Sequence, residues 1–132
     1  MNLNYCIMIT ATAYEKQNSI IALQFTKTLL ESNNHISTIF FYQNGVNNAN
    51  SLITSAIDEI DLILAWCELA KKYKIRLDIC VSAAIRRGLV KTEQTIMLNK
   101  KNKIGNFQNY FNLVSLSYFA QALFFCDRFI QF

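Results

Sequence analysis

Hydrophobic residues recur along the first third of the chain with two alternating periods. Tyr5 to Ile9 is a short apolar run with the length of a buried strand, and Ile20 to Leu30 repeats apolar residues at helical spacing. Asn33-Asn34 interrupts that helical pattern. The β-branched and aromatic segment Ile36 to Tyr42 then predicts a second strand, and a polar loop, Gln43 to Asn50, follows it.

The same alternation continues to the end of the chain, where no linker or repeat divides it. Five strands separated by helices predict an α/β fold, with a five-stranded, mostly parallel sheet flanked by helices on both faces. We therefore expect one domain over residues 1–132. The remaining predicted elements are a helix from Asp58 to Tyr73, a strand from Arg76 to Val81, a short helix ending at Gly88, a weak strand near Tyr110 to Leu113, a helix capped by Ser115 and running through Leu123, and a terminal strand from Arg128 to Phe132.

The predicted helix from Asp58 to Tyr73 carries apolar residues on two stripes. One stripe suits packing on the sheet, and the second is rotated from it by about a third of a turn or more. A deeply buried core helix is the alternative, but a domain this small has little room for one. We therefore predict a subunit interface at the second stripe. The first stripe is Ile60, Ile63, Leu64, Cys67 and Ala70, and the second is Leu62, Trp66, Leu69 and Tyr73.

Composition narrows the possible chemistry. Hydrophobic residues make up 52% of the chain, which suits a folded core, and no apolar run is long enough to cross a bilayer. The first residues lack the basic segment of a signal peptide, so we expect a cytoplasmic protein without membrane contact.

Four Cys and one His without short spacings exclude a zinc cage, and no glycine-rich phosphate loop is present. We expect no metal and no cofactor.

The net charge of +4 permits contact with nucleic acid without arguing for it. Basic residues are spread along the chain except at Lys71-Lys72, Arg86-Arg87 and Lys100-Lys101-Lys103. They do not interleave with aromatic residues, as a nucleic-acid platform would require. A solvated surface is the preferred interpretation, and no direct nucleic-acid binding is expected.

Cys80 is the candidate for chemistry. It stands at the end of a predicted strand and ahead of a helix, and sites in open parallel sheets gather at this edge. Backbone N–H groups at such a position favour a thiolate. The alternative is core packing, the usual role of an unpaired Cys. Asp78 points to the same side of the strand and would oppose ionisation, while Arg86 and Arg87 are too distant along a helix to activate the thiol directly.

Other reactive side chains have structural interpretations. Cys6 falls inside a buried strand, and Cys67 lies on the core stripe of a helix. Cys126 precedes the last strand, where it is core or edge, and His35 is expected at the surface of a turn. The loop Gln43 to Asn50 should open on the same rim as Cys80, where its Asn side chains either form turns or line the site.

Four segments along the chain together form a recognisable pattern: Phe40-Phe41-Tyr42 with Gly45-Val46-x-Asn48-Ala49-Asn50, Asp61-Leu62 with Ala65-Trp66, Leu77-x-Ile79-Cys80-Val81-x-Ala83-Ala84-x-Arg86-Arg87-Gly88, and Cys126-Asp127-Arg128-x-x-Gln131-Phe132. In these segments the sequence resembles the TusD family of DsrE-like sulfurtransferases, and the resemblance covers nearly the whole chain. One departure is the first loop, commonly rich in Gly and Pro in that family, where Ala11, Thr12 and Glu15 change the backbone constraints.

The resemblance implies a persulfide carrier, with Cys80 in the position of the family's reactive cysteine. It implies a hetero-hexamer with TusB- and TusC-like subunits, a TusA-like sulfur donor and a TusE-like acceptor. The sulfur would finally serve 2-thiouridine synthesis at the tRNA wobble position. Two alternatives stay open: a non-catalytic scaffold subunit of the same type of assembly, and a DsrE-type carrier in sulfur oxidation.

Overall fold

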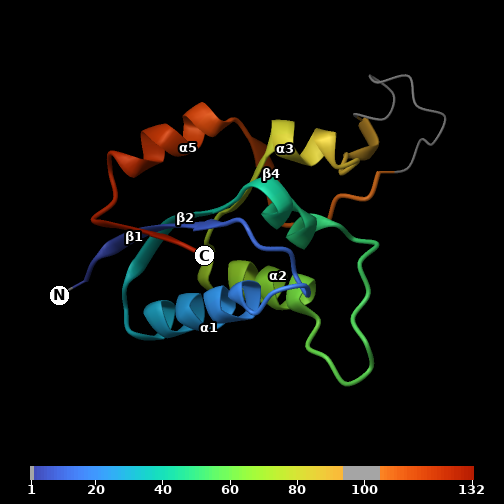
Figure 1. The fold of residues 1–132 in the computed structure, drawn as a ribbon. Helices are drawn as coiled ribbons and strands as arrows, with labels where there is room; N and C mark the ends of the chain where they lie inside the picture. Colours follow the sequence, from blue (N-terminus) through green and yellow to red (C-terminus); the bar gives the residue numbers. More distant parts are fainter. Residues whose placement is uncertain (1, 94–104) are drawn as a thin grey trace.

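A sheet of five parallel strands forms the centre of the computed structural model, which describes residues 2–93 and 105–132 (Figure 1). The strand order is β4-β3-β2-β1-β5, and every neighbouring pair is parallel. The predicted α/β sheet is therefore confirmed. The strands are β1 (Asn4–Ile9), β2 (His35–Phe41), β3 (Leu77–Cys80), β4 (Phe111–Val114) and β5 (Arg128–Gln131).

Helices cover both faces of this sheet, as predicted. Helices α1 (Asn18–Glu31) and α2 (Leu62–Tyr73) lie on one side, and α3 (Val81–Arg86) and α5 (Leu116–Leu123) lie on the other (Figure 1). The predicted loop after β2 is wound into a 3-10 helix, η1 (Gln43–Ala49). None of the described helices is long and apolar enough to cross a membrane. Lys100, Lys101 and Lys103 lie outside the described residues.

Aromatic side chains of β2 join the sheet to both helical layers. Successive residues of a strand point to opposite faces, so Phe40 and Phe41 face different layers. Phe40 stacks on Phe119 of α5 with ring centroids 4.4 Å apart. Phe41 meets Trp66 of α2 edge-on at 5.5 Å. All four rings are fully buried, so β2 is packed from both sides.

Helix α2 differs from its prediction in two ways. It begins at Leu62 rather than Asp58, because Asp61 is the N-cap and accepts a hydrogen bond from Leu64 N at 3.1 Å. The predicted interface stripe is also wrong, since Leu62 and Trp66 are only 3% and 0% exposed. Leu69 is buried and Tyr73 half-buried.

The physical reason is that α2 contacts α1 and η1, while Trp66 also packs against Phe41 of β2. The neighbours on these sides bury both stripes inside the chain. The predicted core stripe is correct for Ile63, Cys67 and Ala70, whereas Leu64 is exposed and Ile60 lies outside the helix.

On the other face of the sheet, the predicted end of α3 and the predicted start of α5 are correct. Gly88 closes the turn after α3 with φ +73°, the left-handed conformation that favours glycine. Ser115 is the N-cap of α5 and accepts a hydrogen bond from Tyr118 N at 3.2 Å. His35 is exposed as expected, although it opens β2 rather than lying in a turn.

Gly45 sets how closely η1 approaches the end of β1. A Cβ atom at this position would lie 2.1 Å from the carbonyl oxygen of Ile9, a backbone atom that cannot move alone. Only a residue without a side chain therefore lets η1 reach the rim of the sheet. At that rim, the backbone N–H of Tyr42 donates a hydrogen bond to Ile9 O at 2.9 Å, which holds the start of η1 there.

We expect Gly45→Ala to lower the free energy of unfolding by about 1–3 kcal/mol, because η1 must move away from β1. Urea denaturation measures this change. Gly88→Ala is the matched control: its Cβ meets nothing within 4 Å, so only the left-handed backbone costs energy, about 1 kcal/mol. An equal loss in the two variants would contradict the close-contact explanation.

Candidate functional site

Cys80 is the last residue of β3 and the N-cap of α3, with an extended backbone at φ −63° and ψ 117°. The sequence places it there because a short buried strand runs directly into a helix-forming segment. Its residue surface is only 3% exposed, yet it lines a pocket of about 510 Å³ at the carboxyl edge of the sheet. Cys80 therefore belongs to the buried core and also borders this opening.

Three segments form the wall of this Cys80 pocket. Arg87 ties two of them together, because its Nε donates to Asn44 Oδ1 at 3.0 Å and its Nη1 donates to Ala83 O at 3.1 Å. Sequence reasoning missed this link and the contribution of Leu116, since nothing in the local pattern places η1 or α5 beside α3. The lining residues are Tyr42, Gln43, Asn44, Cys80, Ser82, Ala83, Arg86, Arg87 and Leu116.

Two asparagines of η1, Asn44 and Asn48, have different roles: one lines the site and the other stabilises the loop. Asn44 lines the Cys80 pocket. Asn48 is fully buried and structural: it accepts from Ser19 Oγ at 3.0 Å and donates to Ala11 O at 3.1 Å and Gly45 O at 2.8 Å. The hydrogen bonds of Asn48 therefore connect the loop after β1 to η1.

The altered residues of the first loop lie apart from the Cys80 pocket. Ala11 is buried, Thr12 is half-buried and Glu15 is exposed, and none of the three lines the pocket. Their contact with the site is indirect, through the hydrogen bond that Asn48 makes to Ala11.

Asp78 lies on the same face of β3 as Cys80 and is fully buried, but its charge is compensated. Thr38 Oγ1 donates to Asp78 Oδ2 at 2.5 Å, and Arg76 donates two hydrogen bonds to the carboxylate at 3.1 and 3.2 Å. Asn112 Nδ2 adds a fourth contact at 3.4 Å. The hydrogen bonds that Arg76 donates to Asp78 raise the pKa of Arg76, so the guanidinium stays charged. The repulsion that Asp78 would exert on a thiolate at Cys80 is weakened accordingly.

The remaining thiols are structural, as the sequence predicted for Cys6 and Cys67. Each donates to a backbone carbonyl: Cys6 to Ala122 O at 3.7 Å, Cys67 to Asn109 O at 3.5 Å and Cys126 to Leu123 O at 3.5 Å. In the described part of the chain, Cys80 makes no such bond. Cys126 is half-buried, so it lies between the two positions predicted for it, the core and the edge of the sheet.

Burial keeps two of these thiols protonated. It raises the pKa of Cys6 from 9.0 to about 12, with the neighbouring Cys126 adding to the effect. It also raises the pKa of Cys67 to about 11, with smaller contributions from the charges of Asp61 and Glu68. Neither thiol is a nucleophile at neutral pH, because the reactive form is the thiolate.

These raised pKa values predict a loss of stability in alkali. Above pH 9 the unfolded chain releases both thiol protons while the folded chain still holds them, so the free energy of unfolding falls as pH rises toward 11 and 12. Each thiol contributes a slope of up to about 1.4 kcal/mol per pH unit. Urea denaturation at pH 8.5 and 10.5 measures the slope, and Cys67→Ala should reduce it. Identical slopes in the two proteins would contradict burial of an un-ionised thiol.

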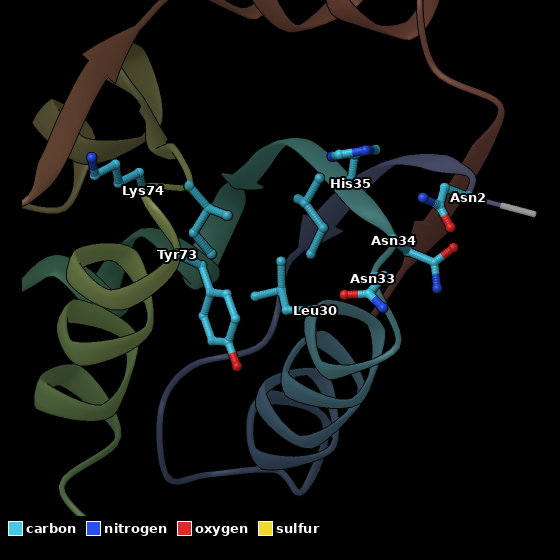
Figure 2. Close-up of a pocket in the computed structure, with 9 residues that line it drawn as sticks. Asn2, Leu30, Asn33, Asn34, His35, Tyr73 and Lys74 are labelled. Carbon is cyan, nitrogen blue, oxygen red and sulfur yellow. The ribbon is translucent and has the colours of Figure 1, made fainter.

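A larger hollow, of about 650 Å³, lies at the amino edge of the sheet between the turns that end α1 and α2 (Figure 2). Asn33 and Lys74 adopt positive φ there to end the helices, and Asn34 Oδ1 accepts from Leu3 N at 3.1 Å. Asn33, Asn34 and Lys74 thus have structural roles. It contains no thiol, and sites in parallel sheets gather at the opposite edge.

Comparison with known proteins agrees with the fold. Residues 4–132 match the model of the DsrE/DsrF-like family. A protein from Sodalis glossinidius named sulfurtransferase TusD is 46% identical over the full length of both chains. The proteins of that name from Proteus mirabilis and Buchnera aphidicola are 43% and 42% identical, over 98–100% of this chain and the full length of each relative.

Two solved structures share the fold. The YchN protein from E. coli superposes with a TM-score of 0.70 over the full length of both chains, at 16% identity. The protein MTH1491 from Methanobacterium thermoautotrophicum superposes with a TM-score of 0.64, at 10% identity and covering 98% of this chain and 99% of its own. At these identities the likeness concerns the arrangement of the sheet and its helices.

Proposed function

The chain belongs to the DsrE/DsrF-like family and is a sulfurtransferase of the TusD kind, and on this premise we propose that Cys80 is the residue that carries the sulfur. The observation behind this proposal is the position of one thiol. Cys80 lines a pocket at the carboxyl edge of the sheet without a hydrogen bond in the described chain, while the other three thiols are bonded to backbone carbonyls.

The proposed reaction needs one nucleophilic sulfur and neither a metal nor a catalytic triad. The Cys80 thiolate attacks the outer sulfur of a donor persulfide. A new S–S bond forms at Cys80, the S–S bond of the donor breaks, and the donor leaves as a thiolate. An acceptor thiolate then attacks the outer sulfur on Cys80, which leaves as a thiolate in turn. The two steps balance without an external oxidant or reductant.

The assignment of the neighbouring proteins follows from the family and is part of the proposal. We infer a TusA-like donor, a TusE-like acceptor, and a cytoplasmic hetero-hexamer with TusB- and TusC-like subunits. The sulfur would serve 2-thiouridine synthesis at the tRNA wobble position, without direct tRNA binding by this chain.

An exposed apolar surface supports the presence of partner subunits. Phe124 and Phe125, at the end of α5, are 85% and 81% exposed, and Phe129 of the edge strand β5 is 45% exposed. Exposed aromatic side chains gathered at one end of a helix and the adjacent strand are typical of protein interfaces. This surface, rather than the buried stripe of α2, is the proposed contact between subunits.

Two alternative functions remain, and each predicts a different observation. A non-catalytic scaffold subunit would keep the fold while Cys80 served only in packing. A DsrE-type carrier in sulfur oxidation would use Cys80 without TusB- and TusC-like partners.

The assignment of Cys80 predicts that a persulfurated TusA-like donor adds one sulfur to the intact chain, seen by mass spectrometry as about +32 Da. Cys80→Ser should abolish the addition, while Cys126→Ser should retain it, because only Cys80 lies in the pocket. Equal labelling of wild type and Cys80→Ser would remove Cys80 from the role and favour the scaffold.

The partner assignment predicts that the chain co-purifies with TusB- and TusC-like chains when they are co-expressed. Replacing Phe124 and Phe125 together by Ser should weaken this association about tenfold or more, since buried aromatic anchors dominate interface energies. Leu52→Ser is the matched control, because Leu52 is 73% exposed in another part of the chain. Failure of the wild-type chain to co-purify would favour the sulfur-oxidation alternative.

A further inference from the structure

Among the described residues, the Cys80 pocket is lined by two positive side chains and no negative one. Arg86 and Arg87 are both among its lining residues. The chain has nine acidic residues, all within the described segments, and none of them lines the pocket. The nearest carboxylate along the strand, Asp78, is already paired with Arg76 at 3.1 Å. Nothing in the pocket wall therefore neutralises its positive charge.

The two arginines are held differently. Arg87 is fixed by its bonds to Asn44 and Ala83, so it shapes the wall. Arg86 is exposed and, in the described chain, makes no hydrogen bond or ion pair. A guanidinium offers five donors arranged to match a carboxylate. An unpaired guanidinium at the rim of a pocket is therefore available to an incoming anion.

We infer that Arg86 recognises an acidic segment of the protein that exchanges sulfur with Cys80, an inference that rests on the function proposed above. The pocket, at about 510 Å³, is far larger than a single sulfur atom and has room for several residues of a partner chain. Charge complementarity selects an acidic segment, because opposite charges steer and orient docking proteins.

The geometry also limits where the acidic residue of the partner lies. Arg86 is six positions beyond Cys80, at the far end of α3, which corresponds to about 9 Å along a helix. An extended chain covers that distance in about three residues. The partner's carboxylate should therefore lie within about three residues of its sulfur-bearing cysteine.

A pair of alkylating reagents tests the charge at the pocket without any partner. Iodoacetate and iodoacetamide react with a thiolate by the same displacement but differ by one negative charge. The ratio of their rates at Cys80, measured by mass spectrometry of the full chain, should fall about twofold to tenfold in Arg86→Gln at low salt. Arg86→Lys should retain most of the ratio, and Arg128→Gln, which removes an exposed arginine on the edge strand β5, should leave it unchanged.

A second measurement tests the acidic segment itself. A blocked pentapeptide with two glutamates should slow alkylation of Cys80 by iodoacetamide, and the same peptide with two glutamines should not. Arg86→Gln should remove this protection. Because Arg86 is exposed and unpaired in the described chain, its replacement should leave the thermal unfolding midpoint unchanged.

The outcomes separate this inference from the proposed function. An unchanged rate ratio and no peptide protection, with persulfuration of Cys80 intact, overturn the role of Arg86 alone. A changed ratio without persulfuration of Cys80 overturns the proposed function and leaves an anion-binding pocket beside the cysteine.

Discussion

The double-sided packing of β2 is the constraint on which the rest of the molecule depends. Phe40 stacks on Phe119 on one face, and Phe41 meets Trp66 on the other. A strand held from both sides fixes the register of β1 and β3 beside it. The carboxyl end of β3, and with it Cys80, is therefore placed by the core rather than by the loops around it.

The site combines this rigid base with a wall built from more local contacts. The close approach of Gly45 to Ile9 brings η1 to the rim, and Arg87 links η1 to α3 through Asn44. Beneath the rim, Arg76, Thr38 and Asn112 share the charge of Asp78. The result is a cysteine whose surroundings contain no unpaired carboxylate, which is the electrostatic condition that a sulfur anion needs.

The sequence was sufficient for the parts of the fold that depend on local patterns. Ser115 and Gly88 marked helix ends because caps are chosen by short-range backbone chemistry, and Cys80 was placed at a strand end by the apolar run before it. The interface stripe of α2 was assigned wrongly, because periodicity shows that Trp66 is apolar without showing which neighbour covers it. The link from Arg87 to Asn44 joins residues 43 positions apart, and no local signal indicates it.

The recessed position of Cys80 has a consequence for the fate of a bound sulfur atom. With only 3% of the residue exposed, an outer sulfur would sit inside the pocket instead of projecting into bulk solvent. A freely diffusing thiol can reach it only through that pocket, which restricts the directions of attack. Delivery is then favoured to a macromolecule whose surface enters the pocket.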